Sequence, residues 1–285
     1  METLFLDPFN ILLIAGFIGF FMAFGIGAND VANSMGTSVG SKAITLKQAI
    51  IIAAIFEFLG AFLAGGEVTS TIRKGIVDPN LYTNDVNIFV MGMLSALLAG
   101  GTWLFIASLR GWPVSTTHSI VGAIIGFVLI SKGVDAVSWG KVGNIAMSWV
   151  TSPLFSGTLA FGLYISAKKL ILDRANPGKA AITFIPLYSF LVAVVISLVT
   201  ARKGLKHVGI EFSENEIYLF TLIFSIIVAT GTAFFLRRNK DQIMREGGIE
   251  FAFGLLMIVS ASAMAFAHGS NDVANAIGPL AAVVS

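Results

Sequence analysis

Two stretches of this sequence, MAFGIGANDVAN at Met22–Asn33 and MAFAHGSNDVAN at Met264–Asn275, agree at nine of twelve aligned positions. Chance would give about one identity, so the agreement marks an internal repeat. Each stretch follows an apolar run and brings an Asn-Asp pair and then a second Asn. Internal duplication is common among secondary transporters, and the repeat therefore predicts a duplicated membrane fold.

The composition assigns the chain to the membrane proteins. Of its 285 residues, 56% are hydrophobic and 12% are charged, whereas a soluble domain carries about 25% charged residues. The net charge of +2 gives no basic surface for a nucleic acid, and the absence of Cys excludes disulfides and thiolate metal sites. We therefore expect an all-α polytopic membrane protein in the lipid bilayer, with no nucleic-acid partner.

Eight apolar runs are candidate membrane spans, because a helix of about 20 apolar residues crosses the hydrocarbon core of a bilayer. The runs are Phe9–Gly27, Leu46–Gly65, Asn87–Leu109, Val114–Ile130, Val142–Ala167, Ala180–Ala201, Ile217–Leu236 and Ile249–Ala267.

Two of these runs are irregular. Val114–Ile130 is the shortest and follows Pro113, so it either crosses the membrane or re-enters on the same side. Val142–Ala167 contains Pro153 near its middle, which we expect to break or kink a helix. If every run crosses, seven crossings separate the two motifs. An odd number gives an inverted-topology repeat, and a re-entrant Val114–Ile130 would undo that count.

The repeat also divides the chain into segments. We expect residues 1–179 to form a first repeat, with the first Asn-Asp motif and the Pro-Val-Ser-Thr-Thr-His stretch. Residues 180–248 are expected to hold connecting spans and a charged loop. Residues 249–285 then begin a second repeat, with the second motif, that the chain does not complete.

The Asn-Asp motifs place carboxylates at the ends of apolar runs. A charge at the centre of a membrane helix costs roughly 2.5–3.5 kcal/mol, so Asp30 and Asp272 need partners or a function. Glycines such as Gly27 and Gly269 favour broken helices. Free backbone carbonyls, a carboxylate and an Asn amide oxygen are hard ligands that suit Na⁺. The alternative interpretation is an Asx turn or helix cap where a helix restarts.

Glu57 is a third acidic residue within an apolar run, in IIIAAIFEFLGAFLAGG. Three interpretations remain open for it: a cation ligand, a proton carrier, or a structural partner of a polar group on a neighbouring helix.

A second polar group lies in GWPVSTTHSIVGAIIG at Gly111–Gly126. Pro113 ends the preceding segment, so the hydroxyls of Ser115, Thr116 and Thr117 stand at the first turn of a new helix. Hydroxyl donors and free N–H groups at a positive helix end form an anion site without a fixed positive charge. The alternative is ordinary capping by Ser or Thr after a Pro.

The stretches GANDVANSMGTSVGSKAIT, PVSTTHSIVGA and AHGSNDVANAIGPL together resemble the inorganic phosphate transporter (PiT) family, of the sodium/phosphate symporter type. This resemblance implies a multi-pass, homodimeric carrier of the cell membrane, with inverted repeats and a re-entrant hairpin. It would import inorganic phosphate with Na⁺ by alternating access, or else with H⁺ or as a metal–phosphate complex. The implied phosphate ligands are Ser115, Thr116, Thr117, Asn33 and Asn275, and the implied Na⁺ ligands are Asn29, Asp30, Asn271 and Asp272. Glu57 is added to the candidate Na⁺ ligands because of its place within an apolar run, not because of the resemblance.

The sequence departs from the family pattern at one place. Family members carry a second P-x-S-T-T-H-like stretch after the second Asn-Asp motif, and none follows before Ser285. We therefore expect an additional segment to complete the anion site.

Other functions are weighed against this one. A proton-coupled phosphate permease or a sulfate permease would use the same fold. An ion channel would need a continuous polar path, whereas duplicated sites in broken helices suggest occlusion. An intramembrane metalloenzyme is disfavoured because no H-E-x-x-H or similarly tight ligand spacing exists. We expect neither enzymatic activity nor a cofactor.

Overall fold

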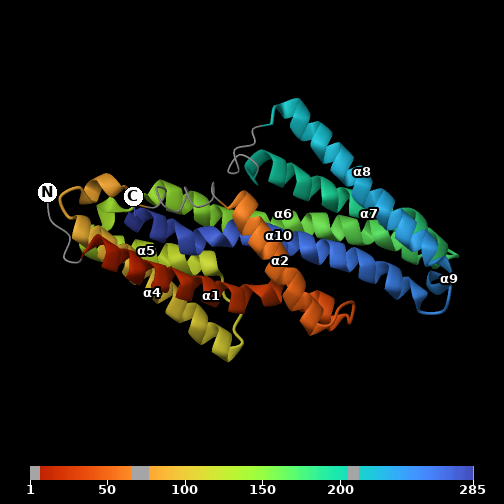
Figure 1. Cartoon of the computed structure of the whole chain (residues 1–285), viewed down its shortest axis with the longest axis horizontal. Coiled ribbons are helices and arrows are strands. Elements are labelled where there is room, and N and C mark those ends of the chain that lie inside the picture. Colours follow the sequence, from red (N-terminus) through yellow and green to blue (C-terminus); the bar gives the residue numbers. More distant parts are fainter. Residues whose placement is uncertain (1–6, 66–76, 205–211, 285) are drawn as a thin grey trace. The chain divides into compact units, whose positions relative to one another are not determined.

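The computed structural model describes residues 7–65, 77–204 and 212–284, and nearly all of them are helical (Figure 1). Among these residues, seven helices are long and apolar enough to cross a membrane. They are α1 (Pro8–Gly40), α2 (Leu46–Ala64), α4 (Val86–Arg110), α6 (Trp139–Ala167), α7 (Pro177–Val199), α8 (Glu214–Arg238) and α10 (Gly248–Val284). The prediction of an all-α polytopic membrane protein is confirmed.

Shorter elements connect these helices. The eighth apolar run forms α5 (Thr116–Lys132), which has 17 residues. The remaining short turns of helix are η1 (Pro79–Tyr82), η2 (Val134–Ala136), η3 (Lys168–Leu172), η4 (Thr200–Gly204) and α9 (Lys240–Ile243). Within the described ranges, β-pairing is limited to one bridge between Val77 and Val137.

The outer faces of the long helices carry large apolar side chains. Phe17 is 75% exposed and Phe20 is 72% exposed on α1. Such side chains are unfavourable in water and favourable against lipid. The apolar runs therefore become helices that satisfy their backbone internally and present hydrocarbon outward.

Neither Asn-Asp motif breaks its helix. The first lies within α1 and the second within α10, and both helices run through without a break. The prediction of broken helices at the motifs is therefore wrong. Helix α6 also continues through Pro153, so the break expected there does not occur and the kink stays a prediction. The motif side chains donate to other side chains, as Asn33 does to Asp30 and Asn275 does to Asp272. They therefore do not compete with the helical backbone bonds.

Packing divides the chain into two compact units. The first unit contains residues 1–34, 57–145 and 268–285, and the second contains residues 35–56 and 146–267. Both Asp residues of the motifs and the Ser-Thr-Thr stretch fall in the first unit. The division into repeats at residues 179 and 248 is a separate matter and stays a prediction.

In the first unit, α4 and α5 lie side by side as a helical hairpin (Figure 1). The base of this hairpin is fixed by Tyr82, which is 1% exposed and shares a hydrogen bond of 2.6 Å with Ser131. Lys132 pairs with Asp85 and lies 5.1 Å from the centre of the Tyr82 ring. These contacts hold the start of α4 and the end of α5 together.

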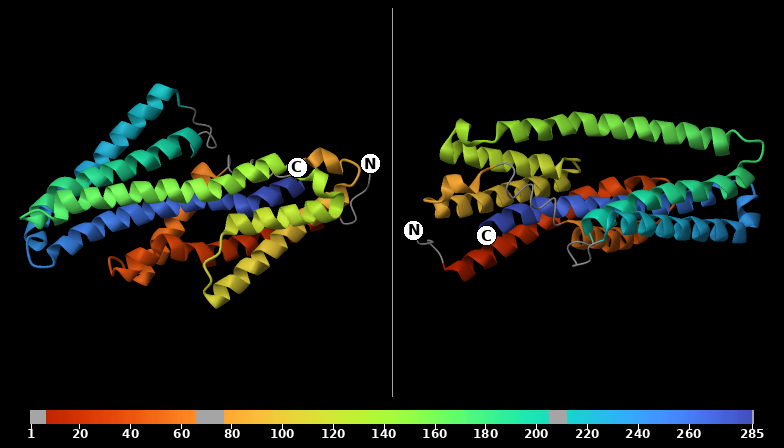
Figure 2. Two further views of the ribbon diagram at one scale, coloured as in Figure 1. Left: turned by 180° about the vertical axis from the view of Figure 1, so that it is seen from behind. Right: turned by 90° about the horizontal axis from the view of Figure 1, so that it is seen from above.

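The second unit is built around the pair α7 and α8, which run side by side (Figure 2). Its core contains Ile171, Ile185, Leu236 and Ile243, all at most 1% exposed. Helix α8 starts with a capping box in which Ser213 and Glu216 satisfy each other's backbone N–H groups. The polar motifs lie elsewhere, so this unit contributes none of the side chains considered below.

Candidate functional site

Close approach of α1 and α4 positions the first motif. A Cβ atom added to Gly25 would lie 3.1 Å from the Cβ of Leu104, and one added to Gly101 would lie 2.9 Å from the Phe21 ring. Glycine at both positions therefore lets the two helices pack closely. Asn29, one turn after Gly25, is thereby placed beside the end of α4.

The turn between α4 and α5 has a defined geometry. Gly111 adopts a left-handed conformation with φ of 66°, and the N–H of Trp112 bonds to the carbonyl of Ala107 at 2.8 Å. This is a common way to end a helix. After Pro113, Ser115 caps α5 by accepting a hydrogen bond of 3.2 Å from the N–H of His118. The hydroxyls thus stand at the start of a helix, as the sequence predicted.

Close approach of α2 and α10 positions the second motif. A Cβ atom on Gly269 would clash with the backbone carbonyl of Glu57, and one on Gly65 would clash with Val273. These glycines allow the end of α2 to lie directly against α10. Glu57 is thereby brought next to His268.

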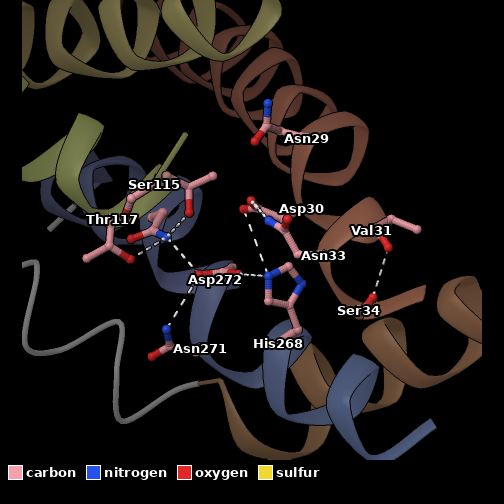
Figure 3. A network of polar contacts seen from close by, with 12 residues as sticks. Asn29, Asp30, Val31, Asn33, Ser34, Ser115, Thr117, His268, Asn271 and Asp272 are labelled. Carbon is pink, nitrogen blue, oxygen red and sulfur yellow. Dashed lines mark hydrogen bonds and ion pairs between the residues drawn. The ribbon is translucent and has the colours of Figure 1, made fainter. Parts of the chain in front are cut away.

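Three carboxylates converge on one imidazole, that of His268. Figure 3 shows two of them, Asp30 and Asp272, joined to the ring. The Nε2 atom of His268 lies 2.8 Å from Asp272 Oδ2 and 4.0 Å from Asp30 Oδ2, and its Nδ1 atom lies 3.4 Å from Glu57 Oε1. Both ring nitrogens face carboxylate oxygens, so either the imidazole carries two protons or a carboxyl group carries one. Asp30 and Asp272 are 4% and 6% exposed, which makes this a buried charge cluster.

The same cluster has the geometry of a cation site. One ligand atom from each of Asp30, His268 and Asp272 lies within 4.8 Å of the other two. Within the described part of the chain, Asp30 Oδ2 has no hydrogen-bond partner although it is buried. A buried carboxylate oxygen without a donor is unfavourable, and a bound cation would satisfy it.

Asn275 links this cluster to the hairpin. Its Nδ2 atom lies 3.1 Å from Thr116 Oγ1, 3.2 Å from Thr117 Oγ1 and 3.1 Å from Asp272 Oδ1. The side chain is 1% exposed. The first turn of α5 is therefore joined to the acidic cluster through a single buried carboxamide.

The remaining predicted residues occupy three different positions. Asn33 donates to Asp30 Oδ1 at 3.3 Å and is exposed, as is Asn271, which lies 3.5 Å from Asp272 Oδ1. Asn29 is buried and faces the turn between α4 and α5. Ser115 is exposed, and its hydroxyl oxygen serves as the helix cap. Glu57 reaches the cluster through His268.

His268 is the residue that the sequence argument missed. The repeat does not point to it, because the first copy of the motif has Ile26 at the equivalent position. The spacing of four residues between His268 and Asp272 placed them on one helix face. That spacing was the available signal.

Chemically, the site offers two adjoining surfaces. Hydroxyl and carboxamide donors from Thr116, Thr117 and Asn275 suit an oxyanion at the start of α5, where the helix dipole is also favourable. The carboxylates of Asp30 and Asp272 suit a hard cation. A site of this kind can hold an anion and a cation next to each other.

Comparisons with known proteins identify relatives of the whole chain. Residues 26–285 match the model of the phosphate transporter family. A protein of Haemophilus influenzae named as a phosphate permease is 52% identical over an alignment of 279 positions, which covers 95% of this chain and 66% of the relative. Inorganic phosphate transporter 2-1, chloroplastic, of Arabidopsis thaliana is 40% identical over an alignment of 300 positions, which covers 94% of this chain and 49% of the relative.

A solved structure is also similar. It is described as the sodium-dependent phosphate transporter and matches with a TM-score of 0.88 and 40% identity, covering 96% of this chain and 67% of that one. The chain thus spans about two thirds of the solved structure and of the bacterial relative, and about half of the plant relative.

Proposed function

Because this chain belongs to the phosphate transporter family, as its motifs led us to expect, we propose that the whole protein imports inorganic phosphate together with Na⁺. The name of the solved relative supports sodium as the partner ion. The single observation that carries the proposal is the contact of Asn275 with Thr116, Thr117 and Asp272, which joins anion donors to an acidic cluster.

Family membership also settles coarser points. The family to which the chain belongs is one of phosphate transporters and not of enzymes, as expected. With its seven candidate spans, it is a multi-pass protein of the cell membrane. The finer features of transport are proposals.

We assign the phosphate oxygens to neutral donors. These are the hydroxyls of Ser115, Thr116 and Thr117 and the carboxamides of Asn33 and Asn275. Neutral donors and a helix N-terminus attract an oxyanion without the strong charge pairing that would hinder its release. Phosphate at neutral pH also keeps a proton that it can donate to a carboxylate such as Asp272, whereas sulfate does not, and this favours phosphate over sulfate.

We assign the cation to the carboxylate side of the site. Asp30, Asp272 and Glu57 would supply oxygen ligands, with the carboxamide of Asn271 beside them. The Oδ2 atom of Asp30 supports this assignment, because it is buried, accepts no hydrogen bond from the described residues and lies 4.0 Å from His268 Nε2.

Coupling between the cation and phosphate follows from the charges of the site. A cation near Asp30 and Asp272 offsets their repulsion of an approaching anion, so each ligand raises the affinity for the other. Protons on the same carboxylates would have a similar effect, which is why proton coupling is the second candidate. A channel would show no such mutual dependence.

The transport cycle that we propose is alternating access in an inverted repeat. At 17 residues, α5 is shorter than a full span, which supports a re-entrant hairpin whose tip carries the anion donors. A homodimer and a further segment that completes the anion site stay predictions from the family resemblance.

The test is uptake of labelled phosphate by the reconstituted protein in liposomes. We expect an inward Na⁺ gradient to drive uptake, and Asp30→Asn to lower it by at least about tenfold, since a buried charged hydrogen-bonding group is lost. Uptake that follows a pH gradient alone would replace Na⁺ by H⁺. A sustained current without coupling, or transport of sulfate in preference to phosphate, would contradict the proposal.

A further inference from the structure

Asn29 is a motif residue whose side chain bonds to backbone groups of the turn between α4 and α5. Its Nδ2 atom donates to the carbonyl of Trp112 at 3.0 Å and lies 3.4 Å from Ser108 Oγ. Its Oδ1 atom accepts from the N–H of Val114 at 3.3 Å. The side chain is 7% exposed. A carboxamide has two donors and two acceptor sites, and three of these four are used at the turn.

The turn depends on these bonds because its own backbone leaves groups unsatisfied. Gly111 and Trp112 donate their N–H groups back to the last turn of α4. Pro113 has no N–H group. The carbonyl of Trp112 and the N–H of Val114 flank Pro113, and Asn29 pairs with both.

We propose that Asn29 is a positioning residue that holds the turn between α4 and α5, and that it is not a cation ligand. This inference rests on the proposed function for its effect on phosphate. Its structural part is independent of what the protein transports.

The position of the turn fixes the anion donors. Val114 is followed at once by Ser115, Thr116 and Thr117, whose hydroxyls we assign to phosphate. These residues stand at the N-terminus of α5, so a shift of the turn shifts all three. Asn29 therefore acts on the anion through the backbone, while its neighbour Asp30 faces the cation side.

The structural test is hydrogen exchange at the amide of Val114 in the membrane-reconstituted protein. We expect Asn29→Ala to raise its exchange rate about tenfold, which corresponds to about 1.4 kcal/mol. Asn29→Asp keeps an acceptor for Val114 but loses both donors, so an intermediate rate is expected. Asn271→Ala is the matched control, because the Asn271 side chain contacts Asp272 and its loss should leave the Val114 amide protected.

The functional test measures binding of inorganic phosphate and of Na⁺ to the same variants. We expect Asn29→Ala to weaken phosphate binding about tenfold while the Na⁺ concentration for half-saturation stays within about twofold. A cation ligand would give the opposite pattern, with weaker Na⁺ binding and unchanged exchange at Val114. That pattern would overturn the proposal.

A second variant covers the case in which Asn29→Ala does not fold. Gly111 has φ of 66°, and a Cβ atom there meets nothing within 4 Å, so Gly111→Ala strains only the backbone of the turn. We expect the same faster exchange and weaker phosphate binding. If exchange at Val114 is unchanged in both variants, the positioning role is wrong. If exchange rises but no variant or parent binds phosphate, the proposed function fails and the positioning role stands.

Discussion

The two copies of the Asn-Asp motif share their sequence but use it differently. In the first copy, Asn29 is buried against the hairpin turn and Asn33 is exposed. In the second copy, Asn271 is exposed and Asn275 is buried against Thr116 and Thr117. Each copy thus buries one carboxamide against the hairpin, the first of the motif (Asn29) in α1 and the second (Asn275) in α10.

This difference between the two copies follows from helix geometry. Two residues four apart lie one turn apart on the same face, so each helix offers two carboxamides along a stripe. A single hairpin meets one turn of α1 and the other turn of α10. Equivalent residues in a repeat therefore share a face but need not share a partner.

The acidic residues differ less than the carboxamides do. Asp30 and Asp272 are both buried and both approach His268. The imidazole itself has no counterpart, because Ile26 stands at that position in the first copy and packs in the apolar core. Both copies thus contribute a carboxylate to the charge cluster, while the imidazole that the carboxylates surround, His268, comes from the second copy.

The largest expected effect is a loss of phosphate uptake that is greater for substitution of Asp272 than for substitution of Asp30. Asp272 lies 2.8 Å from His268 and accepts from Asn275 at 3.1 Å, whereas Asp30 accepts from Asn33 at 3.3 Å and lies 4.0 Å from His268. We expect Asp272→Asn to lower kcat/KM for phosphate uptake about a hundredfold, or about 2.7 kcal/mol. Asp30→Asn should cost about tenfold. Equal losses would show that the copies contribute equally.

The next effect concerns stability and uses the paired glycines. A Cβ atom at Gly269 clashes with the Glu57 carbonyl, while one at Gly27 meets nothing within 4 Å. We expect Gly269→Ala to lower the free energy of unfolding by about 1–3 kcal/mol, as overpacking does. Gly27→Ala should be neutral or slightly stabilising, since Ala favours helix. Thermal unfolding in detergent measures both, and equal melting temperatures would contradict the close approach of α2 and α10.

The smallest effect compares the second carboxamides. Asn275 contacts two hydroxyls and a carboxylate, and Asn33 contacts one carboxylate. We expect Asn275→Ala to raise the KM for phosphate about tenfold, and Asn33→Ala to raise it about threefold. Uptake at varied phosphate concentrations gives both values. A larger effect at Asn33 would mean that the anion lies closer to α1 than to α10.

Much of the fold could be predicted from local sequence. The apolar runs are long enough to span a bilayer, and Gly111 with Pro113 marks the end of α4. The continuity of α1 through its glycines could not be predicted in this way. Glycine lowers helix stability by only about 1 kcal/mol, and tertiary context routinely overrides a preference of this size.

The site could be predicted only in part for a similar reason. Repetition identified Asp30 and Asp272, because a duplicated carboxylate in an apolar run is improbable without a role. The partners of Asn29 lie 79 to 85 residues away in sequence, and no local pattern indicates them. His268 was missed because repetition was the guide and it occurs in one copy.

The contacts of the hairpin also imply an order of assembly during synthesis. The base contacts of Lys132 with Asp85 and of Tyr82 with Ser131 span 47 and 49 residues. The bonds from Asn29 need α1 to be in the membrane already, and the contacts of Asn275 span 158 and 159 residues. Since chains emerge from the ribosome N-terminus first, α1 and the hairpin can associate well before α10 exists. We expect the nascent chain to hold a preformed hairpin whose threonine hydroxyls gain their buried carboxamide partner only when α10 inserts.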